Sequence, residues 1–134
     1  MKTFQLKVKS HIDAAHYIKD YRGKCSRMHG HRWEIEVVLE GSQLNSLNML
    51  VDFSIVKDSL GHALDNLDHY VLNEQLKEEN VTAEYLAKWL YEEMRRRLDD
   101  ESSMLSEVSV WESPECCITY YEESDYEGNS QIQS

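Results

Sequence analysis

One stretch of the chain, residues 25–31, constrains the fold and the chemistry together, and it reads Cys-Ser-Arg-Met-His-Gly-His. His29 and His31 are two residues apart, so on an extended strand both imidazoles project from the same face. The apolar residues that continue this face are Trp33, Ile35 and Val37. This alternation predicts a strand over about residues 31–39 that begins with histidine side chains on a partly buried face.

A third histidine, His16, follows Asp13-Ala14-Ala15 at the end of an earlier alternating segment. Two imidazoles on one face, joined by a third from a neighbouring strand, form the open three-histidine site that is typical of catalytic zinc. The spacing alone leaves open whether His29 and His31 bind a metal or are structural histidines.

Cys25 has three possible roles beside these histidines. It could be a fourth zinc ligand, which would close the site and make it structural. It could be a free thiol near the metal, with its thiolate favoured by the positive charges of Lys24 and Arg27. It could also be an inert core cysteine, and the spacing does not decide among the three.

The hydrophobic periodicity predicts an α+β domain with the order β-β-α-α-β-β. Four strands are expected to form an antiparallel sheet, with two helices covering one of its faces. The expected strands span residues 3–11, about 31–39, about 108–112 and 116–121. The expected helices begin at Asp52 or Ser54 and at Thr82, each with a good N-cap residue.

The apolar stripe of the first expected helix consists of Phe53, Val56, Leu60, Ala63 and Leu64. Residues 70–81 read as a connection between the two helices, and residues 99–103 read as a turn after the second one. We expect residues 1–121 to form one catalytic domain. Residues 122–134 are acidic and polar, and they are expected to be a disordered tail.

Composition limits the classes of partner. The formal net charge of -11 argues against general binding of nucleic acid, which needs a basic surface. No apolar run is long enough to span a membrane, and the N-terminus lacks the apolar core of a signal peptide. The odd number of cysteines favours reduced thiols. These features predict a cytoplasmic protein that does not bind membranes.

Two further places carry groups with possible chemical roles. Asp68 precedes His69 after the first expected helix, where a carboxylate can orient an imidazole or share its proton. Alternatively, His69 has no catalytic role and is simply a histidine at a helix C-terminus, where the helix dipole favours a positive charge. Glu112 lies near a strand end; it could be solvated, or it could grip a flat ring with an amidine-like pair of N–H groups.

With these residues in view, the chain resembles the 6-pyruvoyl-tetrahydropterin synthase superfamily, and more closely its bacterial 6-carboxytetrahydropterin synthase (QueD) branch. The resemblance covers about residues 4–121. The matching pieces, in the family's order, are Asp13-Ala14-Ala15-His16, Gly23-Lys24-Cys25, His29-Gly30-His31, Val51-Asp52-Phe53, Leu67-Asp68-His69-Tyr70-Val71-Leu72-Asn73, Thr82-Ala83-Glu84 and Val110-Trp111-Glu112.

The resemblance implies the tunnelling fold, in which subunits join their sheets into a barrel and two trimeric rings stack into a homohexamer with active sites between subunits. It implies Zn²⁺ as the cofactor, held by His16, His29 and His31. Cys25 would then be the proton-abstracting base and not a ligand, and His69, supported by Asp68, would relay a proton. Glu112 would anchor the pterin ring and take part in the relay. Lys24, Arg27 and Arg22 are candidates to neutralise a triphosphate.

The resemblance also implies the substrate, 7,8-dihydroneopterin triphosphate. In the bacterial branch, the products are 6-carboxytetrahydropterin, acetaldehyde and triphosphate, and the first of these feeds queuosine and 7-deazapurine synthesis. One alternative is a 6-pyruvoyltetrahydropterin synthase, which eliminates triphosphate without cleaving the side chain. Another is a relative that binds pterins or purines but has lost catalysis.

Overall fold

The computed structural model describes residues 1–19, 22–23 and 26–123, and it contains a single four-stranded sheet with helices packed against it. The strands are β1 (Phe4–His16), β2 (His29–Gly41), β3 (Leu105–Ser113) and β4 (Cys116–Tyr121). The helices are α1 (Phe53–Leu64), α2 (Leu72–Leu76), α3 (Ala83–Arg97) and the 3₁₀ helix η2 (Asp99–Met104).

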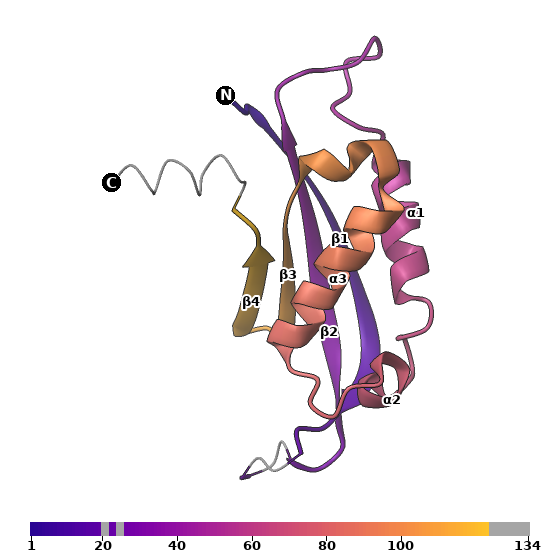
Figure 1. Cartoon of the computed structure of the whole chain (residues 1–134), viewed down its shortest axis with the longest axis vertical. Helices are drawn as coiled ribbons and strands as arrows, with labels where there is room; N and C mark the ends of the chain where they lie inside the picture. The colour runs from indigo at the N-terminus through magenta and orange to yellow at the C-terminus, as the bar shows by residue number, and fades with distance from the viewer. Residues whose placement is uncertain (20–21, 24–25, 124–134) are drawn as a thin grey trace, which may run out of the picture.

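The sheet is antiparallel throughout, with the strand order β1-β2-β3-β4. The long helices α1 and α3 cover one face of it, while α2 lies near the end of the sheet where β1 finishes and β2 begins (Figure 1). Alternate residues of β1, β2 and β3 enter a continuous apolar core with the inner faces of these helices. Burial of this shared surface is the main stabilising contribution to the fold.

The predicted fold class is confirmed, but two of its details are corrected. The segment expected to be a plain connection, residues 70–81, contains the short helix α2, which buries Leu72 and Asn73. The turn expected after the second long helix is the 3₁₀ helix η2. Both are short elements whose formation depends on tertiary contacts more than on local periodicity.

Strand β1 is longer than the sequence predicts, since it continues past residue 11 to His16. The alternation persists there because Ile12, Ala14 and His16 are all buried. Because Ala14 is small and His16 is polar, a hydrophobicity pattern does not reveal that these two positions are in the core. In the β1–β2 register, His16 lies opposite His29, and Ala14 lies opposite His31. The longer strand therefore brings the three histidines to one end of the covered face.

Both predicted helix starts are confirmed. The Asp52 side chain accepts a hydrogen bond from the Ser54 backbone N–H at 2.9 Å, and Thr82 Oγ1 accepts one from the Tyr85 N–H at 3.1 Å. Phe53, expected in the buried stripe, is instead 60% exposed. It is the first residue of α1, and the buried stripe begins one turn later, at Val56.

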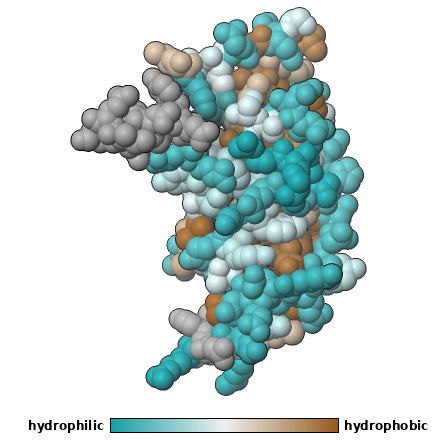
Figure 2. All heavy atoms as spheres, in the orientation of Figure 1, coloured by the Kyte–Doolittle hydropathy of each residue, from teal (hydrophilic) through white to brown (hydrophobic). Residues whose placement is uncertain are grey.

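The face shown in Figure 2 is largely hydrophilic. Its hydrophobic residues form several small patches, some of them at the end of the molecule where the loop between β2 and α1 lies. Phe53 and Met49 help to line an apolar surface hollow beside this loop. None of the described helices is both long and apolar enough to cross a membrane.

The segment that follows α1 lies along the free edge of β1. The His69 N–H donates to the Asp13 carbonyl at 2.6 Å, and the Ala15 N–H donates to the Tyr70 carbonyl at 3.1 Å. Val71 adds an isolated parallel bridge to Ala15. The end of β1 that carries His16 is therefore held on both sides, by β2 and by residues 69–71.

Candidate metal centre

Four side chains converge where β1 ends, β2 begins and β3 approaches its end, and we call them the metal cluster: His16, His29, His31 and Glu112. One potential ligand atom from each lies within 4.8 Å of all the others. His16 is fully buried, and the other three side chains are partly buried. The sheet register produces this convergence because the cross-strand pair His16–His29 and the neighbouring position His31 share one face.

Backbone carbonyls fix the orientation of two of the imidazoles. His16 Nδ1 lies 2.6 Å from the Val81 carbonyl oxygen, and His29 Nδ1 lies 2.7 Å from that of Arg27. A carbonyl oxygen can only accept, so each Nδ1 carries the proton and donates it. In the neutral ring, Nε2 is then an unprotonated acceptor, and this is the arrangement by which proteins orient histidine ligands.

The two Nε2 atoms of His16 and His29 lie 3.0 Å apart. Two neutral acceptors at this separation repel each other unless a proton or a metal cation lies between them. His31 Nε2 is buried and has no hydrogen-bond partner among the described residues, although the Glu112 Oε1 atom is 3.1 Å away. A buried polar atom without a partner is costly. A cation in the middle of the cluster would satisfy all three nitrogens at once.

Burial lowers the pKa of His16 below the ordinary range, against the opposing effect of the hydrogen bond to Val81. Burial is also the main cause of the lowered pKa of His31. Neutral imidazoles are the form that binds metal ions. Trp33 packs edge-on against both rings, with ring centroids 4.8 Å from His16 and 5.3 Å from His31, and thereby helps to exclude water.

A second group, which we call the edge cluster, consists of Asp13, Asp68 and His69. Asp68 Oδ1 accepts a hydrogen bond from the Asp13 N–H at 2.9 Å, and its other oxygen lies 3.8 Å from His69 Nε2. His69 has a φ of 68°, a left-handed conformation that is uncommon for residues other than glycine and is often found at functional sites. The structure thus places Asp68 beside His69, as the sequence predicts.

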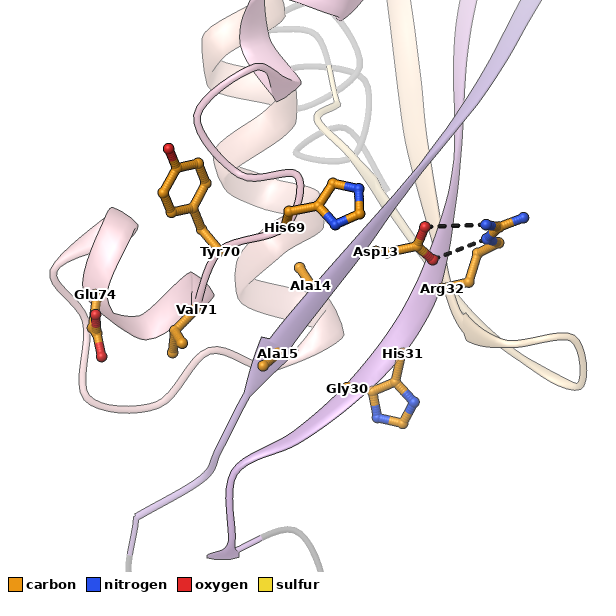
Figure 3. A pocket seen from close by; sticks show the side chains of 10 residues that line it. All are labelled: Asp13, Ala14, Ala15, Gly30, His31, Arg32, His69, Tyr70, Val71 and Glu74. Atoms are coloured by element: carbon orange, nitrogen blue, oxygen red, sulfur yellow. Dashed lines mark hydrogen bonds and ion pairs between the residues drawn. The ribbon is translucent and has the colours of Figure 1, made fainter.

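Figure 3 shows the pocket between the two clusters. It has a volume of about 600 Å³, and its walls include His31 from the metal cluster and His69 from the edge cluster. In the view, Asp13 and Arg32 point toward each other, and they form a two-pronged ion pair at 2.9 and 3.0 Å. The Arg32 guanidinium lowers the pKa of the Asp13 carboxyl.

The remaining predicted site residues lie in the loop between β1 and β2, partly outside the described part of the chain. Arg27 and Arg22 are exposed in the loop between β1 and β2. Cys25 and Lys24 lie outside the described residues, so their predicted roles stay predictions. Cys116 and Cys117 are free and exposed.

Sequence reasoning missed three participants. The carbonyl of Val81 and the carboxylate–guanidinium pair of Asp13 and Arg32 carry no recognisable local signal, because both depend on pairing between distant segments. Trp33 does carry a signal, since it has the same strand parity as His31. Its indole N–H donates to the Ala14 carbonyl at 3.1 Å, so the ring is fixed directly beside the imidazoles.

Comparisons with known proteins agree with this architecture. Residues 5–123 match the family described as 6-pyruvoyl tetrahydropterin synthase, and the chain belongs to that family. The 6-carboxy-5,6,7,8-tetrahydropterin synthase of Bacillus subtilis is 33% identical, covering 88% of this chain and 85% of its own length. The Synechocystis protein of the same name is 36% identical over 60% of this chain and 66% of its own length.

The fold itself recurs in solved structures. The 6-pyruvoyl tetrahydropterin synthase of Caenorhabditis elegans superposes with a TM-score of 0.82 at 24% sequence identity, covering 90% of this chain and 96% of that chain. The Plasmodium falciparum protein of that name gives a TM-score of 0.73 at 18% identity, covering 90% of this chain and 98% of that chain. The subunit fold predicted from the resemblance is therefore confirmed.

Proposed function

We propose that this chain is a zinc-dependent 6-carboxy-5,6,7,8-tetrahydropterin synthase. It would convert 7,8-dihydroneopterin triphosphate and one water molecule to 6-carboxytetrahydropterin, acetaldehyde and triphosphate, as a step toward queuosine and other 7-deazapurines. The observation that carries the proposal is the set of converging Nε2 atoms in the metal cluster, two of them oriented by backbone carbonyls. The curated relatives with this name support the choice of reaction.

The donor set suits zinc. Imidazole nitrogens are common zinc ligands, and three neutral histidines leave the full charge of the ion to act on a substrate. When bound, zinc supplies a Lewis acid that polarises a substrate oxygen and acidifies the neighbouring C–H group. Val81 and Arg27 would keep two of the histidine ligands oriented, because their carbonyls hold the Nδ1 protons.

The remaining chemistry is proton transfer. We assign Cys25 as the base that takes the substrate proton, on the strength of its family position beside the histidines. His69 would return a proton, since its exposed ring lines the same pocket as His31. Asp68 lies 3.8 Å from that ring and would stabilise its protonated form. Glu112 would hold the N–H edge of the pterin ring, and Arg27, Arg22 and Lys24 would neutralise the triphosphate.

We further propose that the working enzyme is a homohexamer, a dimer of trimers with active sites between subunits. β4 forms one edge of the sheet, and the part of β1 before Asp13 forms the other. Unpaired strand edges favour pairing with another chain, which closes the sheet into a barrel.

Product analysis tests the reaction. Purified protein loaded with zinc is incubated with 7,8-dihydroneopterin triphosphate, and acetaldehyde and pterin products are measured by chromatography. We expect acetaldehyde and 6-carboxytetrahydropterin in equal amounts. A pyruvoyl product without acetaldehyde would instead identify a 6-pyruvoyltetrahydropterin synthase, and tight pterin binding without turnover would identify a non-catalytic relative.

A further inference from the structure

Glu112 lies in the metal cluster itself, although its proposed role is to anchor a ring. Its Oε1 atom is 3.1 Å from His31 Nε2 and 3.6 Å from His16 Nε2. The contact with His31 lacks the geometry of a hydrogen bond, because His31 Nε2 remains without a hydrogen-bond partner among the described residues. The carboxylate oxygen is therefore close to both histidine nitrogens without a well-aligned hydrogen bond to His31.

The separations match those of ligands around a single ion. With bonds of about 2.0–2.1 Å to zinc, neighbouring ligand atoms of a tetrahedral site lie about 3.3 Å apart. The pairs formed by Glu112 with His31 and His16 are close to that value, and so is the 3.0 Å pair of His16 and His29. Three of the ligand-atom pairs among the three imidazoles and the carboxylate thus have nearly the spacing of a four-coordinate shell, and all the ligand atoms lie within 4.8 Å of one another.

Strand alternation explains why Glu112 faces this centre, because it shares the parity of Val108 and Val110, which are both buried. The pairing of β3 with β4 is irregular between Trp111 and Ser113, and Glu112 has no partner in the register. Such bulges often occur next to active sites. The Glu112 side chain is also 31% exposed, so one side of it faces water and the carboxylate has room to move.

We propose that Glu112 is a fourth, displaceable ligand of the metal that His16, His29 and His31 hold. Without substrate, its carboxylate closes the coordination shell. When a pterin binds, the carboxylate leaves the metal for the N–H edge of the ring, and this opens a coordination position for the side-chain oxygens of the substrate. The same movement of the Glu112 carboxylate would then bind the pterin ring and free a coordination position on the metal. The inference rests on the proposed function and adds a resting state to it.

The test uses cobalt(II) in the full-length protein, because its visible absorption reports the number and type of ligands. We expect the Glu112→Ala protein to bind the metal at least about 10-fold more weakly than the unaltered protein and to show a changed cobalt spectrum. Glu112→Gln keeps the shape of the side chain, so a spectral change in this variant would not result from misfolding. It should show the same spectral change as Glu112→Ala. Glu115→Ala is the matched control, since Glu115 is exposed in the same hairpin.

Unsubstituted pterin then tests displacement. It presents the ring edge that Glu112 would hold, but it has no side chain that could bind the metal. Adding it should shift the cobalt spectrum of the unaltered protein toward that of Glu112→Ala and leave the spectrum of Glu112→Ala unchanged. Pterin that fails to bind, as followed by its fluorescence, or that binds without a spectral shift in the unaltered protein, overturns the displacement.

A His16→Ala variant separates the two levels of the argument. If it loses cobalt while Glu112→Ala retains the normal affinity and spectrum, the fourth-ligand inference is wrong and the zinc site of the proposed function stands. If His16→Ala binds cobalt as the unaltered protein does, the zinc site itself is wrong.

Discussion

The metal cluster and the edge cluster lie close together along β1, which contributes His16 to the first and Asp13 to the second, but their surroundings differ. Neighbouring residues of a strand point to opposite faces, and an even or odd position decides which face. His16 is on the helix-covered face and is fully buried. Asp13 is on the open face, and its carboxylate is neutralised by Arg32. One strand therefore contributes a buried imidazole to the metal cluster and an exposed carboxylate to the edge cluster.

Burial decides what each cluster can do. In the metal cluster, the Nδ1 protons of His16 and His29 are donated to backbone carbonyls, so the Nε2 atoms of these rings are available to a cation. In the edge cluster, the His69 side chain is 76% exposed and the Asp68 side chain 43%. Water can hydrate these groups in either protonation state, which suits proton exchange better than metal binding. The comparison predicts that variants in the two clusters have separable effects.

The largest effect is expected from His29→Ala. Removal of a ligand should weaken zinc binding by more than about 100-fold, beyond the 10–100-fold typical of losing an outer-shell partner, and turnover should disappear with the metal. Competition with a chelating dye measures the affinity. His62→Ala is the control, because His62 is exposed and its ring contacts the Asp58 carbonyl of its own helix. Equal zinc affinity in all three proteins would exclude His29 as a ligand.

His69→Ala should separate catalysis from metal binding. We expect turnover to fall by about 10²–10⁴-fold, the usual contribution of a general acid or base, while zinc affinity changes less than twofold. Steady-state kinetics and the same dye competition give the two values. A variant that loses zinc in parallel with turnover would show that the two clusters form a single site and that the distinction drawn here is wrong.

Arg32→Gln should have the smallest effect. The Arg32 hydrogen bond lowers the pKa of Asp13, so the ion pair stabilises the fold above the ordinary carboxyl pKa and loses this contribution as the pH falls through the lowered value. The variant should return the pKa of Asp13 toward about 3.9 and reduce the acid dependence of stability slightly, because both groups are exposed. NMR titration of the carboxyl carbon measures this. An unchanged pKa would remove Arg32 as its cause.

Much of the fold could be predicted from the sequence, because periodicity and capping are local signals. The α+β order, the caps at Asp52 and Thr82 and the strand at 116–121 are all present in the structure. The extension of β1 to His16 was missed, since a buried histidine does not look like a core residue. The exposure of Phe53 was missed because the sequence does not show where a helix first meets the sheet.

The sequence indicates which residue types form the site, but it does not show how they are arranged in space. The strand spacing indicates that His29 and His31 share a face, but the partnership with His16 depends on the β1–β2 register. Glu112 has the strand parity of the buried Val108 and Val110, but its place beside the imidazoles depends on the pairing of β2 with β3. The roles of Cys25, His69 and Glu112 in catalysis stay predictions.

The central claim is that the converging histidine nitrogens hold zinc, and the metal content of the purified chain tests it most directly. The protein is incubated with zinc, freed of excess metal by gel filtration and analysed by mass spectrometry, alongside His29→Ala. We expect about one zinc ion per chain in the unaltered protein and less than about one tenth of that in the variant. Equal zinc in the two proteins, or none in either, would contradict the account.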